Sequence, residues 1–134
     1  MVYFAFKFAI TVFKNVKNFL ETNPNSVVLD VRTEEEWNEI GKPDAESLNS
    51  KTFFISLLLG PERKKNENFI KDFLQKKISK KNNILVICRS GVRSMAAAKL
   101  LQREGYKNLV NISDGFEGNP VTGDGWKKSN LPCK

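Results

Sequence analysis

The sequence contains no histidine. Without an imidazole the chain cannot form a Cys–His or Ser–His catalytic pair, a histidine-ligated metal site, or an imidazole proton shuttle. Any nucleophilic side chain must therefore be activated by backbone dipoles and by nearby cations. We expect no metal site and no bound cofactor.

Cysteine is scarce, and long apolar runs are missing. The only two cysteines, Cys88 and Cys133, lie far apart in the sequence and neither has a Cys-x-x-Cys partner, which suits a reducing compartment. No stretch approaches the roughly 20 apolar residues that span a bilayer. The apolar residues 1–13 are interrupted by Lys7 and lack both a basic start and a small-residue cleavage site. We therefore expect a cytoplasmic protein with no membrane partner, whose first strand covers about residues 1–10.

The chain is basic but has no clear nucleic-acid-binding pattern. Its 134 residues carry a formal net charge of +7. The lysines occur in small scattered clusters, and aromatic residues do not alternate with them as a stacking platform for nucleic acid would require. We expect one domain over residues 1–134 and no nucleic-acid partner. It should be a monomer or a weak homodimer, since the apolar N-terminus offers a surface for self-association.

The residues around Cys88 are the most informative part of the chain. Residues 84–87 are apolar and mostly β-branched, as in a strand buried on both faces. Residues 95–104 are strong helix formers, and Gly105 should end that helix. Cys88 therefore lies between the carboxyl end of a strand and the amino end of a helix, where open α/β sheets bind ligands.

The composition of this loop favours a reactive cysteine. Thiols ionise more readily near a helix N-terminus or close to arginine, and the loop supplies both influences through its amides and through Arg89 and Arg93. Ser90 and Gly91 allow a tight turn whose N–H groups can point inward to hold an anion. The alternative is that Cys88 is an inert, buried, small apolar residue, as many free cysteines are.

The segment Cys88-Arg89-Ser90-Gly91-Val92-Arg93-Ser94 resembles the active-site loop of single-domain rhodaneses, a family of sulfurtransferases. Further segments match in the same order along the chain: residues 29–33 with 36–37, then 40–41, then 114–118 with 125–126 and 131–132. The resemblance implies catalysis by Cys88. It also implies substrate binding by the rest of the loop, which is Arg89, Ser90, Gly91, Val92, Arg93 and Ser94.

The fold that this resemblance implies agrees with the alternation of strands and helices. We expect an α/β protein with a parallel, mostly five-stranded sheet and helices on both faces. Asp30 and Arg32 should be buried polar groups that tie loops together, and Thr33 with Glu36 forms a capping box. Residues 12–21 should be helical, and residues 53–59 a strand or an apolar loop.

The end of the chain shows fewer regular patterns. The resemblance to rhodaneses implies that residues 114–118 form a tight turn beside the Cys88 loop. Residues 119–134 should form an irregular tail, in which Trp126 and Leu131 anchor the chain to the surface of the domain. Cys133 should be exposed.

The expected reaction moves sulfur through a Cys88 persulfide. The donor would be a small anion such as thiosulfate, and the acceptor a thiol or a protein. Arg93, at the closing position of the loop, is expected to fold over the pocket mouth and contact the anionic donor. Two alternatives remain open: a non-catalytic interaction module of the same fold, and a sulfur carrier that serves another protein. A cysteine-dependent phosphatase would need its arginine at position 94, which is Ser94.

Overall fold

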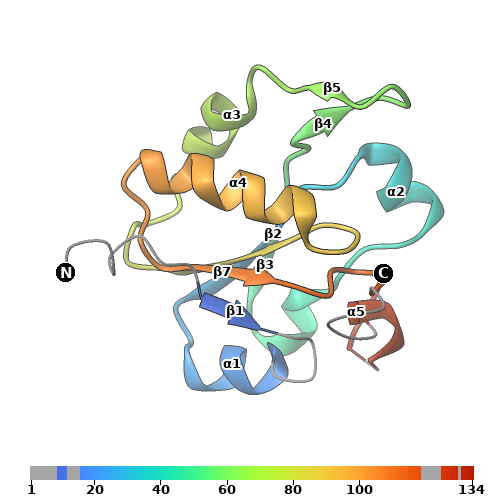
Figure 1. The fold of residues 1–134 in the computed structure, drawn as a ribbon. Helices are drawn as coiled ribbons and strands as arrows, with labels where there is room; N and C mark the ends of the chain where they lie inside the picture. Colours follow the sequence, from blue (N-terminus) through green and yellow to red (C-terminus); the bar gives the residue numbers. More distant parts are fainter. Residues whose placement is uncertain (1–8, 12–15, 119–124, 130) are drawn as a thin grey trace.

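The computed structural model describes residues 9–11, 16–118, 125–129 and 131–134. Five parallel strands form one sheet at its centre (Figure 1). Their order across the sheet is β1 (Ala9–Thr11), β7 (Leu109–Ile112), β6 (Asn83–Ile87), β2 (Ser26–Asp30) and β3 (Lys51–Phe54). The predicted parallel α/β sheet is therefore confirmed.

Helices cover both faces of the sheet, as predicted (Figure 1). One face packs against α3 (Phe69–Gln75) and α4 (Val92–Arg103). The other packs against α1 (Val16–Thr22), the 3₁₀ helix η3 (Ala45–Leu48) and α5 (Gly125–Lys128). Helix α2 (Glu34–Glu39) follows β2 beyond the carboxyl edge of the sheet. A small hairpin of β4 (Leu58–Leu59) and β5 (Lys64–Lys65) lies near α2 and α3.

Strand β6 aims Cys88 into the core beneath α4. Successive side chains of a strand point to opposite faces. Ile84, Val86 and Cys88 belong to the apolar cluster on the α3–α4 face, whereas Leu85 and Ile87 belong to the cluster on the opposite face. Cys88 thus continues the alternation of β6 one residue past its end, and its side chain lies under the start of α4.

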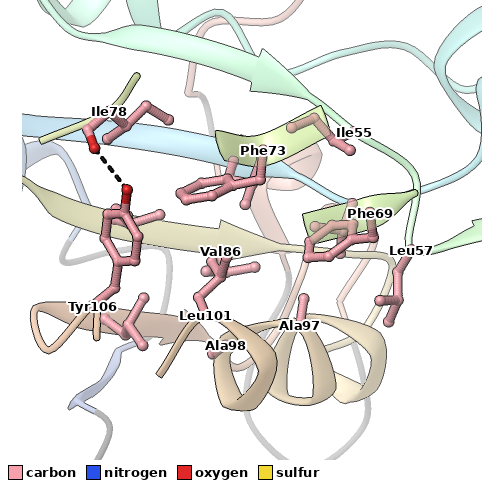
Figure 2. Close-up of a cluster of buried hydrophobic side chains, with 14 of the residues drawn as sticks. Ile55, Leu57, Phe69, Phe73, Ile78, Val86, Ala97, Ala98, Leu101 and Tyr106 are labelled. Atoms are coloured by element: carbon pink, nitrogen blue, oxygen red, sulfur yellow. Dashed lines mark hydrogen bonds between the residues drawn. The ribbon is translucent and has the colours of Figure 1, made fainter. Parts of the chain in front are cut away.

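Aromatic rings and small residues together fill the α3–α4 face (Figure 2). The rings of Phe73 and Tyr106 pack edge to face with centroids 5.1 Å apart, and the Tyr106 hydroxyl donates a hydrogen bond to the Ile78 carbonyl. Ala97 and Ala98 of α4 are fully buried in the same cluster. Because alanine is small, α4 can lie close to the sheet, which fixes the position of its N-terminus relative to β6.

Two elements differ from their predicted bounds. Helix α4 begins at Val92 rather than at residue 95, because Gly91 adopts φ +106° and turns the chain directly into the helix. The predicted helix over residues 12–21 is α1, Val16–Thr22; residues 12–15 lie outside the described part. The predicted first strand over residues 1–10 also falls mostly outside it, and β1 covers Ala9–Thr11.

The prediction of an irregular tail was wrong for part of the segment. Residues 119–124 lie outside the described part, but residues 125–128 form α5. Trp126 is fully buried rather than a surface anchor, because its ring joins the core on the α1 side of the sheet and its indole N–H donates to the Pro132 carbonyl at 2.7 Å. The predicted apolar segment 53–59 is divided between the end of β3 and β4.

Replacing Phe73 by alanine should destabilise the fold strongly. The ring is fully buried, so Phe73→Ala removes its packing and leaves a cavity, which costs about 3–5 kcal/mol in the free energy of unfolding. The adjacent Leu74 is 46% exposed and provides a matched control, since Leu74→Ala should cost much less. Urea unfolding of both variants gives the comparison. Similar losses in the two variants would contradict the described packing of α3.

Candidate active site

The sulfur of Cys88 lies against the turn that leads into α4. Cys88 is 1% exposed, and the Gly91 amide N–H donates a hydrogen bond to its Sγ at 3.1 Å. Its thiol donates to Ser94 Oγ at 3.4 Å. Because the first amides of an α-helix have no partner within the helix, the sulfur lies at an end of α4 that favours negative charge.

A buried hydrogen-bond network fixes the position of Ser94, the residue whose hydroxyl contacts the Cys88 sulfur. The Ser94 hydroxyl donates to Asn111 Oδ1, and Asn111 Nδ2 donates to the Gly91 carbonyl at 3.2 Å. Ser94 is fully buried and Asn111 is 3% exposed. Ser94, predicted to bind substrate, therefore contacts the sulfur and also links α4 to β7. Sequence analysis did not identify Asn111, although a polar residue in an otherwise apolar strand was a usable signal.

Two glycines interlock the Cys88 loop with the turn after β7. Gly91 and Gly115 both have positive φ, at +106° and +65°. A Cβ atom on Gly91 would overlap the Ser113 carbonyl, and one on Gly115 would overlap the backbone of Arg89. The Phe116 amide donates to the Cys88 carbonyl at 2.7 Å. The predicted contact between the turn at residues 114–118 and the Cys88 loop is thus confirmed.

The guanidinium of Arg93 is held by a carboxylate of the protein. Its two terminal nitrogens donate to the two oxygens of Glu36 at 2.7 and 2.9 Å, and both side chains are 11% exposed. Arg93 was expected to fold over the pocket mouth. Its guanidinium instead forms a bidentate pair with Glu36, which ties α2 to the Cys88 loop. Glu36 also forms the predicted capping box with Thr33.

The pairing with Arg93 changes the acidity of Glu36. Burial by itself would raise the pKa of this carboxyl, but the hydrogen bonds from Arg93 and from the Thr33 backbone outweigh it and lower the pKa from 4.5 to about 2. Glu36 is therefore a fixed negative charge under physiological conditions, and it neutralises the charge of Arg93.

The remaining loop residues differ widely in exposure. Arg89 is 62% exposed, with its Nε 3.4 Å from a carboxylate oxygen of Glu117. Ser90 is half-buried, whereas the Val92 side chain is 78% exposed and points away from the core. Of the predicted binding residues, Gly91 contacts the sulfur through its amide, Ser94 through its hydroxyl, and Arg89 presents its cation to solvent.

A pocket of about 460 Å³ opens beside the loop. Helix α2 and the residues that flank it, the β4–β5 hairpin and the Cys88 loop with the turn after β7 form its walls. Its lining residues are Thr33, Glu35, Glu36, Glu39, Ile40, Gly60, Pro61, Arg63, Arg89 and Glu117. Arg63 is 44% exposed and reaches to within 3.5 Å of Glu36. Sequence analysis identified neither Arg63 nor Glu117 as part of the site.

Asp30 and Arg32 form a fully buried pair next to the site. The Arg32 guanidinium donates to both Asp30 oxygens and, through Nη2, to the Gly41 carbonyl at 2.8 Å. Its carbon Cζ lies 4.1 Å from the centroid of the Phe116 ring. Both side chains are 0% exposed, so the predicted structural role of this pair is confirmed.

Cys133 is exposed, as predicted. It forms an isolated β-bridge with Pro43, and partial burial raises the pKa of its thiol.

In the described part of the chain, no group of three or more Cys, Asp or Glu residues is placed to hold a metal ion. Among the helices of those same residues, none has the length and apolarity needed to cross a membrane.

These features define a class of α/β domains that present a cysteine in the loop between the central strand and the following helix. Comparisons of sequence show which proteins of this class the chain resembles. A family model described as the STR4 middle domain matches residues 8–134. An uncharacterized protein of Rickettsia prowazekii, RP600, is 46% identical over 118 residues, covering 86% of this chain and 88% of that protein. Rhodanese-like domain-containing protein 17 of Arabidopsis thaliana is 33% identical over 88 residues, 66% of this chain and 54% of its own.

Solved structures of other proteins show the same fold. The structure of Rv0390 from M. tuberculosis superposes with a TM-score of 0.81 at 30% identity and covers 96% of this chain and 98% of its own. A rhodanese-like domain protein from Staphylococcus aureus shares the fold, with a TM-score of 0.61 at 24% identity over 94% of this chain and 98% of its own. The chain belongs to the STR4 middle-domain family and has a rhodanese-like fold.

Gly91→Ala should destabilise the protein more than Gly60→Ala does. Both glycines have positive φ, which costs a side chain about 1–2 kcal/mol, but only at Gly91 would the new methyl overlap backbone atoms. No atom lies within 4 Å of a Cβ placed on Gly60. Urea unfolding at neutral pH measures the difference between the two variants. Equal losses would show that the loop and the turn are not closely packed.

Glu36→Gln should lower stability in a pH-dependent way. The carboxyl has a lower pKa in the folded protein than in the unfolded chain, so its contribution is fully present above about pH 4.5 and is lost as the pH falls toward 2. We expect the variant to lose up to about 3 kcal/mol at pH 7 and progressively less at lower pH. The measurement is urea unfolding between pH 7 and 3, with Glu34→Gln as the control. A difference that does not change with pH would contradict the assigned pKa.

Proposed function

We propose that the protein is a sulfurtransferase in which Cys88 carries a sulfane sulfur as a persulfide. The observation that carries the proposal is the hydrogen bond from the Gly91 amide to Cys88 Sγ at the N-terminus of α4. This arrangement favours negative charge on sulfur without an imidazole. Membership of the STR4 middle-domain family and similarity to a rhodanese-like domain-containing protein support the same reaction class.

The first step loads sulfur onto the cysteine. The Cys88 thiolate attacks the outer sulfur of thiosulfate and forms a new S–S bond. The S–S bond of thiosulfate breaks, its electron pair leaves with sulfite, and a Cys88 persulfide anion remains. Charge balances, because a thiolate and a dianion give a persulfide anion and a dianion, and no external oxidant or reductant is required.

The second step returns the sulfur to an acceptor. A thiolate or cyanide attacks the outer sulfur of the persulfide, and the bond to Cys88 Sγ breaks to restore the thiolate. Arg89 and Arg63 are the exposed cations that would attract an anionic donor. Arg93 acts as a positioning residue, because its pair with Glu36 fixes the loop around the sulfur.

The same geometry also suits a sulfur carrier whose acceptor is another protein. In that case Cys88 would take up sulfur but transfer it slowly to small molecules. A purely binding module would not need the backbone amide of Gly91 to donate a hydrogen bond to the Cys88 sulfur. The phosphatase alternative is not favoured, since position 94 holds a buried serine and the guanidinium of Arg93 is paired with Glu36.

The Cys88 thiol must stay free of disulfide formation and oxidation so that it can accept sulfur again after each turnover. We propose that the protein works in the cytoplasm, where Cys88 stays reduced between turnovers. Its partners would be a small sulfur-donor anion and a thiol acceptor, with no nucleic acid or membrane involved. Cys133 has no proposed part in the reaction, because partial burial raises the pKa of its thiol and its Sγ donates a hydrogen bond to the Leu131 carbonyl.

Incubation with thiosulfate should add one sulfur atom to Cys88. Mass spectrometry of the desalted protein and its peptides measures the gain. Cys133→Ser should gain the same mass, and Cys88→Ser should gain none while remaining folded. A Cys88→Ser variant that still turns over thiosulfate and cyanide would overturn the proposal. A folded wild-type protein that takes up no sulfur would indicate a binding module.

A further inference from the structure

The pocket beside the Cys88 loop contains more carboxylates than guanidinium groups. It is lined by the carboxylates of Glu35, Glu36, Glu39 and Glu117 and by the guanidinium groups of Arg63 and Arg89. Such a pocket is not built to favour anions alone. Because Arg89 of the Cys88 loop lines this pocket, its charge pattern bears on which molecules approach the loop.

The internal ion pairs account for only part of this charge. Glu36 is paired with Arg93 and lies 3.5 Å from Arg63, and Glu117 lies 3.4 Å from Arg89. No salt bridge described for the chain includes Glu35 or Glu39, and both are exposed. Since the two are four residues apart on α2, they lie on one face of the helix and line the same wall of the pocket.

We propose that the sulfur acceptor is a low-molecular-weight aminothiol, a thiol that carries an ammonium group a few bonds from its sulfur. The inference rests on the proposed function of Cys88 as a persulfide carrier. The ammonium group would lie against Glu35 and Glu39, and the thiolate would approach the loop next to Arg89. A pocket of about 460 Å³ is of the size that holds small molecules.

Opposite charges within one acceptor fit the pocket better than a single sign does. A thiolate without a cation would be attracted by Arg89, as the anionic donor is, but would gain nothing from the carboxylates of Glu35 and Glu39 on α2. An aminothiol carries its own compensating charge, so the same carboxylates attract and orient it. Glu35 and Glu39 would thus determine acceptor specificity, and they take no part in bond making.

The transfer step balances without an additional reagent. The Cys88 persulfide anion first takes up a proton from the solvent. The aminothiol thiolate then attacks the outer sulfur of the protonated persulfide and forms a new S–S bond. The bond between that sulfur and Cys88 Sγ breaks, and its electron pair stays on Cys88 as a thiolate. The acceptor leaves as a protonated persulfide, so one anion enters the step and one anion remains.

The test compares acceptors on protein that has been loaded with sulfur by thiosulfate and freed of excess donor. Cysteamine, 2-mercaptoethanol and 3-mercaptopropionate are similar in size and differ in charge. Single-turnover rates of sulfur removal are compared at equal thiolate concentration. The measured quantity is the ratio of the cysteamine rate to the 3-mercaptopropionate rate. Because the intrinsic reactivity of each thiol is the same with every variant, it cancels when the ratio is compared between proteins.

We expect the double variant Glu35→Gln/Glu39→Gln to lower this ratio about three- to tenfold, and raised salt to lower it in the wild type. Glu35→Lys/Glu39→Lys should lower it further. The control Glu34→Gln/Glu67→Gln removes the same charge at exposed positions outside the pocket lining and should leave the ratio unchanged. The expected order of rates in the wild type is cysteamine, then 2-mercaptoethanol, then 3-mercaptopropionate.

The outcomes separate this inference from the proposed function. Sulfur that loads and transfers with an equal ratio in the wild type and in the two Glu35/Glu39 double variants would overturn the aminothiol proposal alone. Sulfur that never loads onto the folded wild-type protein would overturn the proposed function, and the acceptor proposal with it. A ratio that falls equally in the control variant would also overturn the proposal, because the preference would then come from overall charge.

Discussion

The close approach of two backbone segments at Gly91 and Gly115 is the constraint on which the site depends. A Cβ atom on either glycine would overlap backbone atoms of the other segment, so the packing of the Cys88 loop against the turn after β7 requires glycine at both positions. Backbone hydrogen bonds from Phe116 and Glu117 to the loop carbonyls complete the contact, and the amide of Trp126 bonds to Gly115. The C-terminal segment is therefore part of the support of the cysteine.

Charge pairing fixes the other side of the loop. The Glu36–Arg93 pair joins α2 to the start of α4, and the buried Asp30–Arg32 pair joins the end of β2 to Gly41. These pairs hold the guanidinium groups of Arg32 and Arg93 away from bulk solvent. Within the loop, the cation exposed to solvent is Arg89, and the Gly91 amide of the backbone donates the hydrogen bond to the sulfur.

The predictable features were those encoded by neighbouring residues. The apolar run before Cys88 indicated the central strand, and the Thr33–Glu36 spacing indicated the cap of α2. The partner of Arg93 was not predictable, because Glu36 is 57 residues away and its capping role gave no sign of a second contact. The burial of Trp126 was missed for a similar reason: its core contacts are distant in sequence, and its neighbours are polar and glycine-rich.

Sulfite release in the absence of any acceptor tests the central claim most directly. If Cys88 takes the outer sulfur of thiosulfate and keeps it as a persulfide, each chain should release one sulfite in a single burst and then stop. The Cys88→Ser protein should release none. Continuous release without acceptor, or no release from folded wild-type protein at saturating thiosulfate, would contradict the account.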